Sequence, residues 1–333
     1  MQTDAVKIHQ KIFSKDNFNF EEIALELFKF QYTHNLVYRQ FTDYLKINIR
    51  KVQSVQQIPF LPIELFKTHN IIVNNVETKK IFESSGTTGQ ITSRHLVADL
   101  DLYTQSFEEC FKQFYGNIED WTILALLPSY LERDTSSLVF MVDDLIKKSN
   151  NKSSGFYLNN LDELAKALES RLTAHDSKKT LLIGVTFALL DFAEQFPMDL
   201  SDIIIMETGG MKGRREEMTR EEVHGILTKA FNISAIHSEY GMTELLSQGY
   251  SKGNGIFEVP YWMKIMKRDI YDPFNVSENA GRGGLNVIDL ANIYSCAFIA
   301  TQDLVNIKNE TEFEVLGRLD NADIRGCNLM VSM

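Results

Sequence analysis

Cysteine and positive charge are both scarce in this chain, and each shortage excludes a class of protein. Only three of the 333 residues are cysteines, and their spacing fits neither a zinc site nor a disulfide framework, so we expect a reducing, cytoplasmic location. The formal net charge is −11 and no basic stripe offsets it, which argues against a nucleic-acid partner. We expect no membrane span and no signal peptide, because no apolar run is long enough and the N-terminus lacks a basic start.

Hydrophobic residues, by contrast, make up 44% of the chain, with 22 Phe and 12 Tyr, enough for a large core. Between residues 101 and 237, short apolar runs alternate with helical patterns, which predicts an α/β domain with a mostly parallel sheet. Strands are expected at 121–127, 180–185, 203–206 and 233–237. Helices are expected at 101–115, 136–148, 187–195 and 219–231.

The two ends of the chain have different patterns. Residues 4–48 have helical spacing, with Asn19 as a possible N-cap. The segment from Ile58 is extended, and a short helix with Pro62 at its first position is expected to follow. Strands are expected at 285–288, 297–301 and 313–316, and turns at 207–210 and 281–284. We therefore predict an N-terminal helical segment (1–57), an α/β nucleotide-binding core (58–255) and a β-rich subdomain (256–333).

A loop of small and hydroxylated residues follows the β-prone run 80–82. It consists of Ser84, Ser85, Gly86, Thr87, Thr88 and Gly89. Such a loop leaves backbone N–H groups free to surround one centre, and its hydroxyls add donors, as a polyphosphate requires. No Gly-Lys-Ser/Thr follows, so it is not a Walker loop, and we infer ATP attacked at the α-phosphate. The alternative is an ordinary surface loop, where the same residues are common.

A second segment, Tyr240, Gly241, Met242, Thr243 and Glu244, follows a predicted buried strand at the edge where open α/β sheets bind ligands. The glycine would let the aromatic ring lie flat against a base, and the glutamate would hold Mg²⁺ beside phosphate oxygens. Strand-to-helix turns also contain such residues without binding anything.

Two further residues suit a ribose. Asp303 follows a predicted strand and would accept hydrogen bonds from both hydroxyls, whereas Arg318 would pair with ribose or phosphate oxygens. The alternatives are a turn or N-cap for the aspartate and a weak surface salt bridge for the arginine.

Taken in order, these segments resemble the adenylate-forming superfamily of acyl-CoA synthetases, luciferases and peptide-synthetase adenylation domains. The resemblance covers the phosphate loop, the Tyr-Gly-x-Thr-Glu signature, the ribose aspartate, the Gly-Arg-x-Asp hinge at 317–320, and the adenine-lining strand end at Thr208, Gly209 and Gly210. It implies an acyl-CoA synthetase-like large domain with mostly parallel sheets flanked by helices, plus a β-rich subdomain.

A narrower resemblance is to the acyl-protein synthetases, the fatty-acid ligase components of bacterial luminescence systems and their relatives. It is carried by residues 58–62, 66–67, 126–133 and 325–328. It implies that a carboxylic acid, fatty by this resemblance, reacts with ATP to give an acyl-adenylate and pyrophosphate. The acyl group then passes to a protein thiol, with an acyl reductase or acyl carrier as a possible partner.

The sequence departs from the superfamily in two places. The chain stops at Met333, so we expect the C-terminal lid and its catalytic lysine to be absent, as in the acyl-protein synthetases. The phosphate loop continues through Ser93-Arg94-His95 instead of Pro-Lys, so Arg94 is a candidate for the cationic role. Lys67, Lys212 and Arg214 are the other candidates.

The resemblance assigns roles to the remaining residues. Residues 84–89 would hold pyrophosphate, and Glu244 would hold Mg²⁺. Asp303 and Arg318 would hold the ribose, and Thr243 would approach the α-phosphate. Cys327 would carry the acyl group, or else is a buried apolar residue of the last strand, whereas Cys110 and Cys296 are expected to be structural. The aromatic stretches 107–115 and 257–262 are either walls of an acyl groove or plain core.

Two alternative functions stay open from the sequence. One is a small acyl- or aryl-CoA ligase, because phenylacetate-type ligases share the loop and the Tyr-Gly-x-Thr-Glu segment. The other is a non-catalytic nucleotide- or acyl-binding subunit that lost turnover together with the lid.

Overall fold

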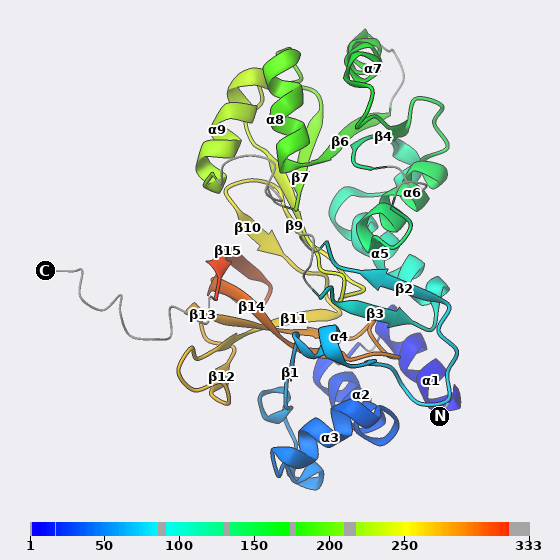
Figure 1. Cartoon of the computed structure of the whole chain (residues 1–333), viewed down its shortest axis with the longest axis vertical. Helices are drawn as coiled ribbons and strands as arrows, with labels where there is room; N and C mark the ends of the chain where they lie inside the picture. Colours follow the sequence, from blue (N-terminus) through cyan, green and yellow to red (C-terminus); the bar gives the residue numbers. More distant parts are fainter. Residues whose placement is uncertain are drawn as a thin grey trace, which may run out of the picture.

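A 13-stranded sheet runs through the part of the chain that the structure describes, with helices flanking it (Figure 1). The structure is a computed structural model, and it describes residues 2–16, 18–85, 91–128, 133–173, 178–209 and 218–319. The strand order is β12-β11-β13-β14-β15-β10-β9-β8-β7-β6-β4-β5, with β1 beside β14. The strands β2 and β3 form a separate pair.

One half of the sheet is parallel. It contains β4 (Trp121–Leu126), β5 (Gly155–Phe156), β6 (Lys179–Val185), β7 (Ile204–Thr208) and β8 (His237–Tyr240). Its helices are α5 (Leu100–Tyr115), α6 (Ser137–Ser149), α7 (Leu161–Thr173), α8 (Thr186–Gln195) and α9 (Arg220–Phe231). In Figure 1, α8 and α9 lie on one side of β6 and β7, and α5 and α6 on the other. Because both faces are covered, β4 is buried along its whole length, and the predicted α/β fold with a parallel sheet is confirmed.

Two boundaries in this half differ from the predicted ones. The prediction of a strand at 233–237 is wrong, because β8 pairs with β7 only from His237, which lies opposite Met206. The predicted turn at 207–210 also begins too early, because Glu207 and Thr208 are strand residues in register with β6. Consequently Tyr240 is the last residue of β8 and does not lie beyond the strand.

The other half of the sheet is antiparallel. It contains β9 (Gly249–Ser251), β10 (Ile256–Glu258), β11 (Met263–Arg268), β12 (Val276–Ser277), β13 (Gly281–Asp289), β14 (Phe298–Ile307) and β15 (Glu312–Arg318). The three strands predicted beyond residue 255 are confirmed as parts of longer ones, although β14 begins at Phe298, one residue later than predicted. The predicted turn at 281–284 is wrong, because these residues begin β13. A Cβ on Gly283 would lie 2.6 Å from the Arg268 carbonyl oxygen, so glycine serves close strand approach there.

The segment around Pro62 is extended, as predicted, but its helix begins later. Strand β1 (Leu61–Pro62) pairs in parallel with β14, and the Ile63 N–H donates to the Ala300 carbonyl oxygen at 3.0 Å. These bonds keep the backbone extended, so α4 (Leu65–Thr68) begins three residues after Pro62. The prediction of proline at the first helical position is therefore wrong. The hairpin strands β2 (Lys80–Glu83) and β3 (Arg94–Val97) enclose the serine–glycine loop.

The N-terminal region is helical, as predicted. It contains α1 (Gln2–Ile12), α2 (Phe20–His34) and α3 (Leu36–Tyr44), followed by short 3₁₀ turns at Ile49–Lys51 and Val55–Gln57. A third 3₁₀ turn, Ile118–Asp120, lies between α5 and β4. Asn19 caps α2 by accepting from the Glu22 N–H, which confirms the predicted cap. The buried Gln31 amide donates to the carbonyl oxygens of Asn292 and Ile293, so α2 is anchored to the segment after β13.

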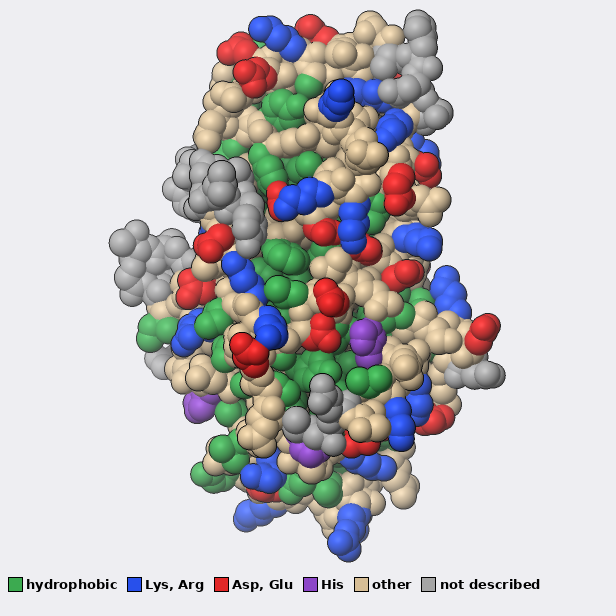
Figure 2. All heavy atoms as spheres, turned by 90° about the vertical axis from the view of Figure 1, so that its right-hand side faces the viewer, with side chains coloured by type: hydrophobic (Ala, Val, Ile, Leu, Met, Phe, Trp, Pro, Cys, Tyr) green, Lys and Arg blue, Asp and Glu red, His purple; other side chains and the backbone are tan. Residues whose placement is uncertain are grey.

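Strands from both predicted regions, 58–255 and 256–333, join the same sheet. Their division into a core and a subdomain stays a prediction. On the face drawn in Figure 2, Lys and Arg are mixed with Asp and Glu around hydrophobic side chains. In the described part of the chain, no helix combines the length and the apolar character needed to cross a bilayer.

Candidate active site

A pocket of about 330 Å³ opens at the carboxyl ends of β7 and β8. Open parallel sheets bind ligands at this edge, because the strands end there and loops diverge. The predicted site residues that line the pocket are Ser85, Gly209, Tyr240, Gly241, Met242 and Thr243. The fold therefore brings together residues from the serine–glycine loop and from two strand ends.

Tyr240 and Asp303, predicted site residues from different segments, are in direct contact. The Tyr240 hydroxyl donates to Asp303 Oδ2 at 2.7 Å, and the ring packs edge-on against Phe313. Arg318 lies opposite Asp303 in the β14–β15 ladder, with its Nε 3.9 Å from Oδ1. Burial raises the pKa of Asp303, and the Tyr240 hydrogen bond and the arginine charge oppose that rise.

The buried pair His95 and Asn292, which the sequence did not reveal, contacts the Thr243–Glu244 backbone. His95 on β3 donates from Nδ1 to the Thr243 carbonyl oxygen at 2.8 Å, and its Nε2 lies 3.2 Å from Asn292 Oδ1. The Asn292 amide donates to the Glu244 carbonyl oxygen at 2.8 Å. Burial lowers the pKa of His95 to about 4, so the ring is neutral at pH 7. Only spatial contacts reveal this role, because no spacing links residues 95 and 292.

A buried carboxylate fixes the next turn of the same segment. Asp289 accepts from the N–H groups of Leu246 and Ser247, at 2.8 and 3.0 Å, and from the Ser247 hydroxyl at 2.6 Å. The hydroxyl in turn accepts from the Trp262 indole at 2.9 Å. Segment 241–248 is thereby fixed by side chains behind the pocket, which orders the pocket wall in advance of any ligand.

Glu244 is buried and lies beside Ser93, which follows the serine–glycine loop in the sequence. Burial raises its pKa, whereas a hydrogen bond from Ser93 and the charges of Arg318 and Lys67 lower it. Ser93 also donates its N–H to Ser84 Oγ at 2.9 Å, and the Ser84 N–H donates back to the Ser93 carbonyl oxygen at 3.0 Å. The base of the loop and Glu244 are thus linked through one serine.

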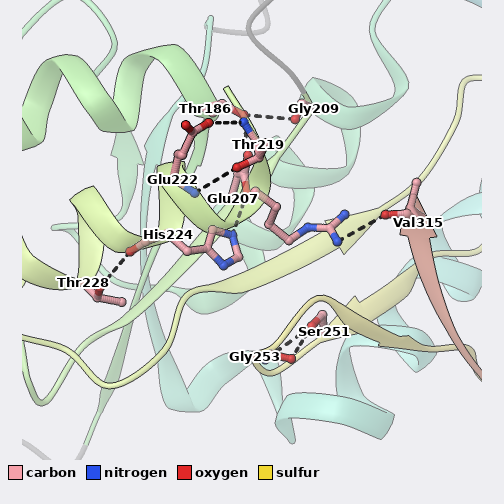
Figure 3. Close-up of polar contacts among 11 residues, drawn as sticks. Thr186, Glu207, Gly209, Thr219, Glu222, His224, Thr228, Ser251, Gly253 and Val315 are labelled. Carbon is pink, nitrogen blue, oxygen red and sulfur yellow. Dashed lines mark hydrogen bonds and ion pairs between the residues drawn. The ribbon is translucent and has the colours of Figure 1, made fainter. Parts of the chain in front are cut away.

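The end of β7 is fixed by contacts with residues of α8 and α9 (Figure 3). The Thr186 hydroxyl donates to Glu207 at 2.5 Å and to the Gly209 carbonyl oxygen at 3.1 Å. His224 on α9 bonds to the second oxygen of Glu207 at 2.9 Å. Gly209 has a φ of +74°, a conformation that favours glycine, so this strand end needs a residue without a side chain.

Two arginines that were not among the expected cations line the pocket. Arg220 is one of them; its guanidinium lies 5.5 Å from the centre of the Phe257 ring and donates to the Val315 carbonyl oxygen at 3.3 Å. Arg133 is the other. Arg94 is exposed on β3, opposite Glu83 in the hairpin, and its cationic role stays a prediction.

Several predicted residues lie outside the described ones: Gly86, Thr87, Thr88, Gly89, Gly210, Lys212, Arg214 and Cys327. Cys110 and Cys296 are buried, and burial raises the pKa of the Cys296 thiol to about 12, which suppresses its reactivity. Among the aromatic candidates, Phe257 lines the pocket, whereas Phe107 and Phe111 belong to the core.

The donor set around Glu244 suits Mg²⁺ in one particular way. The described residues contain no group of three or more His, Cys, Asp or Glu able to hold a metal on their own. Mg²⁺ in nucleotide sites is commonly held by one or two carboxylates together with phosphate oxygens. A single carboxylate such as Glu244 fits that arrangement.

Comparison with solved structures defines the class of the fold. A structure of 2-hydroxyisobutyryl-CoA ligase in complex with 2-HIB-AMP and CoA, in its thioesterification state, has a TM-score of 0.63 and 12% identity, and the match covers 94% of this chain and 70% of that chain. An open conformation of the same ligase has a TM-score of 0.58 and 11% identity, covering 90% and 75%. The chain therefore has the acyl-CoA synthetase-like fold of adenylate-forming ligases.

None of the curated proteins matches the chain. The family model described as "Acyl-protein synthetase, LuxE" matches residues 10–333. The chain belongs to this family and is an enzyme of the adenylate-forming ligase type, as the sequence resemblance implied.

Proposed function

We propose that this protein joins a carboxylic acid to the α-phosphate of ATP and then passes the acyl group to a thiol. The observation that carries the proposal is the convergence of Ser85, Gly209, Tyr240 and Thr243 on one pocket, with Asp303 bonded to the tyrosine. Membership of the acyl-protein synthetase family supports the same reaction.

In the first step a carboxylate oxygen attacks the α-phosphorus, and the bond from that phosphorus to the bridging oxygen breaks, releasing pyrophosphate. The protein's task is to align the reactants and to stabilise the leaving charge. Gly209 and Gly241 present bare backbone at the pocket wall, which allows a base to lie against Tyr240. Asp303 and Arg318 would hold the ribose, and Ser84 and Ser85 would hold the pyrophosphate. Thr243 would contact the α-phosphate.

Glu244 would hold Mg²⁺ together with phosphate oxygens of ATP. When bound, the metal neutralises charge on the leaving pyrophosphate. The Ser93 hydrogen bond and the His95–Asn292 pair orient this residue from behind, so the carboxylate is directed before the nucleotide enters.

In the second step a thiolate attacks the acyl carbonyl carbon, AMP leaves, and the thiol proton passes to solvent. We propose Cys327 as the thiol, because Cys110 and Cys296 are buried and Cys327 is the remaining cysteine of the chain. A fatty acid as the substrate and an acyl reductase or acyl carrier as the partner are proposals that rest on the family alone.

The deciding experiment is carboxylate-dependent exchange of labelled pyrophosphate into ATP, run over a panel of acids with Mg²⁺. We expect exchange with at least one acid and no requirement for CoA. Consumption of the adenylate only on addition of CoA, without protein labelling, would favour a CoA ligase. Nucleotide binding without exchange for any acid would mean a binding subunit and would refute the proposed reaction.

A further inference from the structure

A second cavity is larger than the pocket at the ends of β7 and β8. We call it the apolar groove, and it is lined by residues of the segment 41–64, of the β11–β12 hairpin (268–276) and of β14 (300–302). Its volume is about 770 Å³, against about 330 Å³ for the pocket. The two cavities share none of the lining residues that the structure describes, so the groove is a separate site.

Most of the lining is hydrophobic, and part of it is open to solvent. On the hairpin, Phe274 is 67% exposed and Ile270 is 36% exposed, whereas Phe60 of the N-terminal segment is buried. Soluble proteins rarely leave large apolar side chains exposed together at a cavity unless a ligand or a partner covers them. The groove is therefore a candidate binding site.

Polar side chains also line the groove, and each already has a hydrogen-bond partner in the protein. The Gln302 amide donates to Glu64 Oε1 at 2.6 Å. Arg268 donates to Asn286 Oδ1 at 2.5 Å and to the Thr301 carbonyl oxygen at 2.7 Å. The other bonded side chains of the lining are Gln56, Gln57, Asp269 and Thr301. Such a groove suits a hydrocarbon chain better than a peptide, because the backbone groups of a peptide would be buried there without partners.

The groove and the proposed nucleotide site meet at β14. Gln302 bonds to Glu64 in the groove. The next residue, Asp303, bonds to Tyr240 of the pocket, as expected for neighbours that point to opposite faces of a strand. Arg318 contacts both residues: its guanidinium donates to Gln302 Oε1 at 3.2 Å, and its Nε lies 3.9 Å from Asp303 Oδ1.

The chain continues from this point into the groove. Leu319 follows Arg318, lines the groove and donates its N–H to the Gln302 carbonyl oxygen at 2.6 Å. Cys327, the proposed thiol, comes eight residues later, and eight residues span at most about 29 Å. Because this tether begins at the groove itself, an acyl group on Cys327 can reach it.

We infer that the groove holds the hydrocarbon chain of the acyl group after its transfer to Cys327. The inference rests on the proposed function and adds a second site to it: the adenylate forms in the pocket, and the acyl-enzyme keeps its chain in the groove. Burial of the chain removes apolar surface from water, which favours this state. A chain held there also keeps the thioester against the protein, where nucleophiles from solvent have less access.

Photo-crosslinking of the full-length protein locates the chain. The acyl-enzyme is formed from ATP, Mg²⁺ and a long-chain fatty acid with a diazirine at its far end, then irradiated and digested, and the linked peptides are identified by mass spectrometry. We expect links to residues 41–64 and 268–276 in the wild-type protein, and none there in Cys327→Ser, which stops at the adenylate. Links confined to other parts of the chain would overturn the inference alone.

Variants of Phe274 measure how strongly the groove holds the chain. The readout is the rate at which hydroxylamine attacks the thioester carbonyl carbon, freeing the thiol and releasing the labelled acyl group as a hydroxamate. In the wild-type protein we expect release to slow as the chain lengthens, because each added methylene strengthens the contact with the groove. Phe274→Asp should speed release of long chains about tenfold, since loss of one apolar contact of this size is worth at least that factor. Phe274→Leu, which stays apolar, should keep release slow.

Tyr271→Asp is the matched control, because Tyr271 is exposed on the same hairpin and does not line the groove. We expect it to release the acyl group at the wild-type rate. Equal release rates for the wild type and Phe274→Asp would overturn the inference and leave the proposed function intact. Pyrophosphate exchange without any acyl label on the protein would overturn the transfer to Cys327 and the inference together. Absence of exchange with every acid would overturn the proposed function as a whole.

Discussion

The hydroxyl of Tyr240 donates a 2.7 Å hydrogen bond to Asp303, which follows it by 63 positions in the sequence. The bond joins the last residue of β8 to the middle of β14, on the far side of β9, β10 and β15 in the sheet order. It therefore ties the pocket residue Tyr240 to β14 across the antiparallel part of the sheet.

Tyr240→Phe removes this donor and leaves a partly buried carboxyl without its partner. We expect the free energy of unfolding to fall by about 1–3 kcal/mol, as for other buried groups left unsatisfied. We also expect KM for ATP to rise, because Asp303 loses its orientation. Urea denaturation and exchange kinetics check both effects. If the variant folds and its KM for ATP is unchanged, Asp303 does not take part in nucleotide binding. Tyr271→Phe, at an exposed position, is the matched control.

His95→Gln should alter the pH dependence of stability. The folded-state pKa of His95 is about 4, below its ordinary 6.5, so between these values the unfolded chain binds the additional proton. The stabilising contribution of the neutral ring is therefore present above pH 6.5 and is lost as the pH falls to 4, by at most about 3 kcal/mol. We expect the wild-type protein to lose more stability than the variant between pH 7 and pH 4.5 in urea titrations. His69→Gln, at an exposed position, should leave the wild-type slope unchanged, and an equal slope for His95→Gln would contradict the prediction.

The strand–helix alternation was predictable because it depends on local pattern, and the four candidate segments were identified from local pattern in the same way. Apolar runs such as 121–126 identify buried strands, and the Tyr-Gly-x-Thr-Glu signature is contiguous. The failures at 233–237 and 281–284 have a different origin. Strand limits there depend on which backbone groups of β7, β11 and β14 are available for pairing, and these belong to distant segments.

The residues that the sequence did not reveal share this cause. His95, Asn292 and Asp289 act on segment 241–248 from strands or loops that precede or follow it by tens of residues. Glu239 directly precedes the motif, yet only strand geometry shows that its side chain points to the face of the sheet opposite to Tyr240. Pattern reasoning finds groups that are adjacent in the chain, whereas positioning contacts are set by packing.

Cys327→Ser should separate the two steps of the reaction. Adenylate formation does not need the thiol, so we expect pyrophosphate exchange at the wild-type rate. We expect no hydroxylamine-labile acyl label on the protein after incubation with labelled acid and ATP, because a serine hydroxyl is a far weaker nucleophile than a thiolate. Cys296→Ala, which alters a buried cysteine, should retain the label. Equal labelling of the Cys327→Ser protein would refute the assignment.

Glu239→Gln should stabilise the protein at high pH. The pH dependence of stability that Glu239 causes has the opposite sign to that of His95. Burial raises the pKa of Glu239 from 4.5 to about 7, and the Thr208 hydrogen bond only partly offsets this rise. The folded protein therefore holds more protons than the unfolded chain between these values, and stability falls as the pH rises through 7. Glutamine does not titrate, so the variant does not lose this stability. We therefore expect the free energy of unfolding of the variant, relative to that of the wild type, to rise by at most about 3 kcal/mol between pH 4.5 and pH 8. Chemical denaturation at both pH values measures the difference, with Glu169→Gln, at an exposed position on α7, as the control. A constant difference between wild type and variant would show that Glu239 does not titrate in this range and that its carboxyl is not buried as the geometry requires.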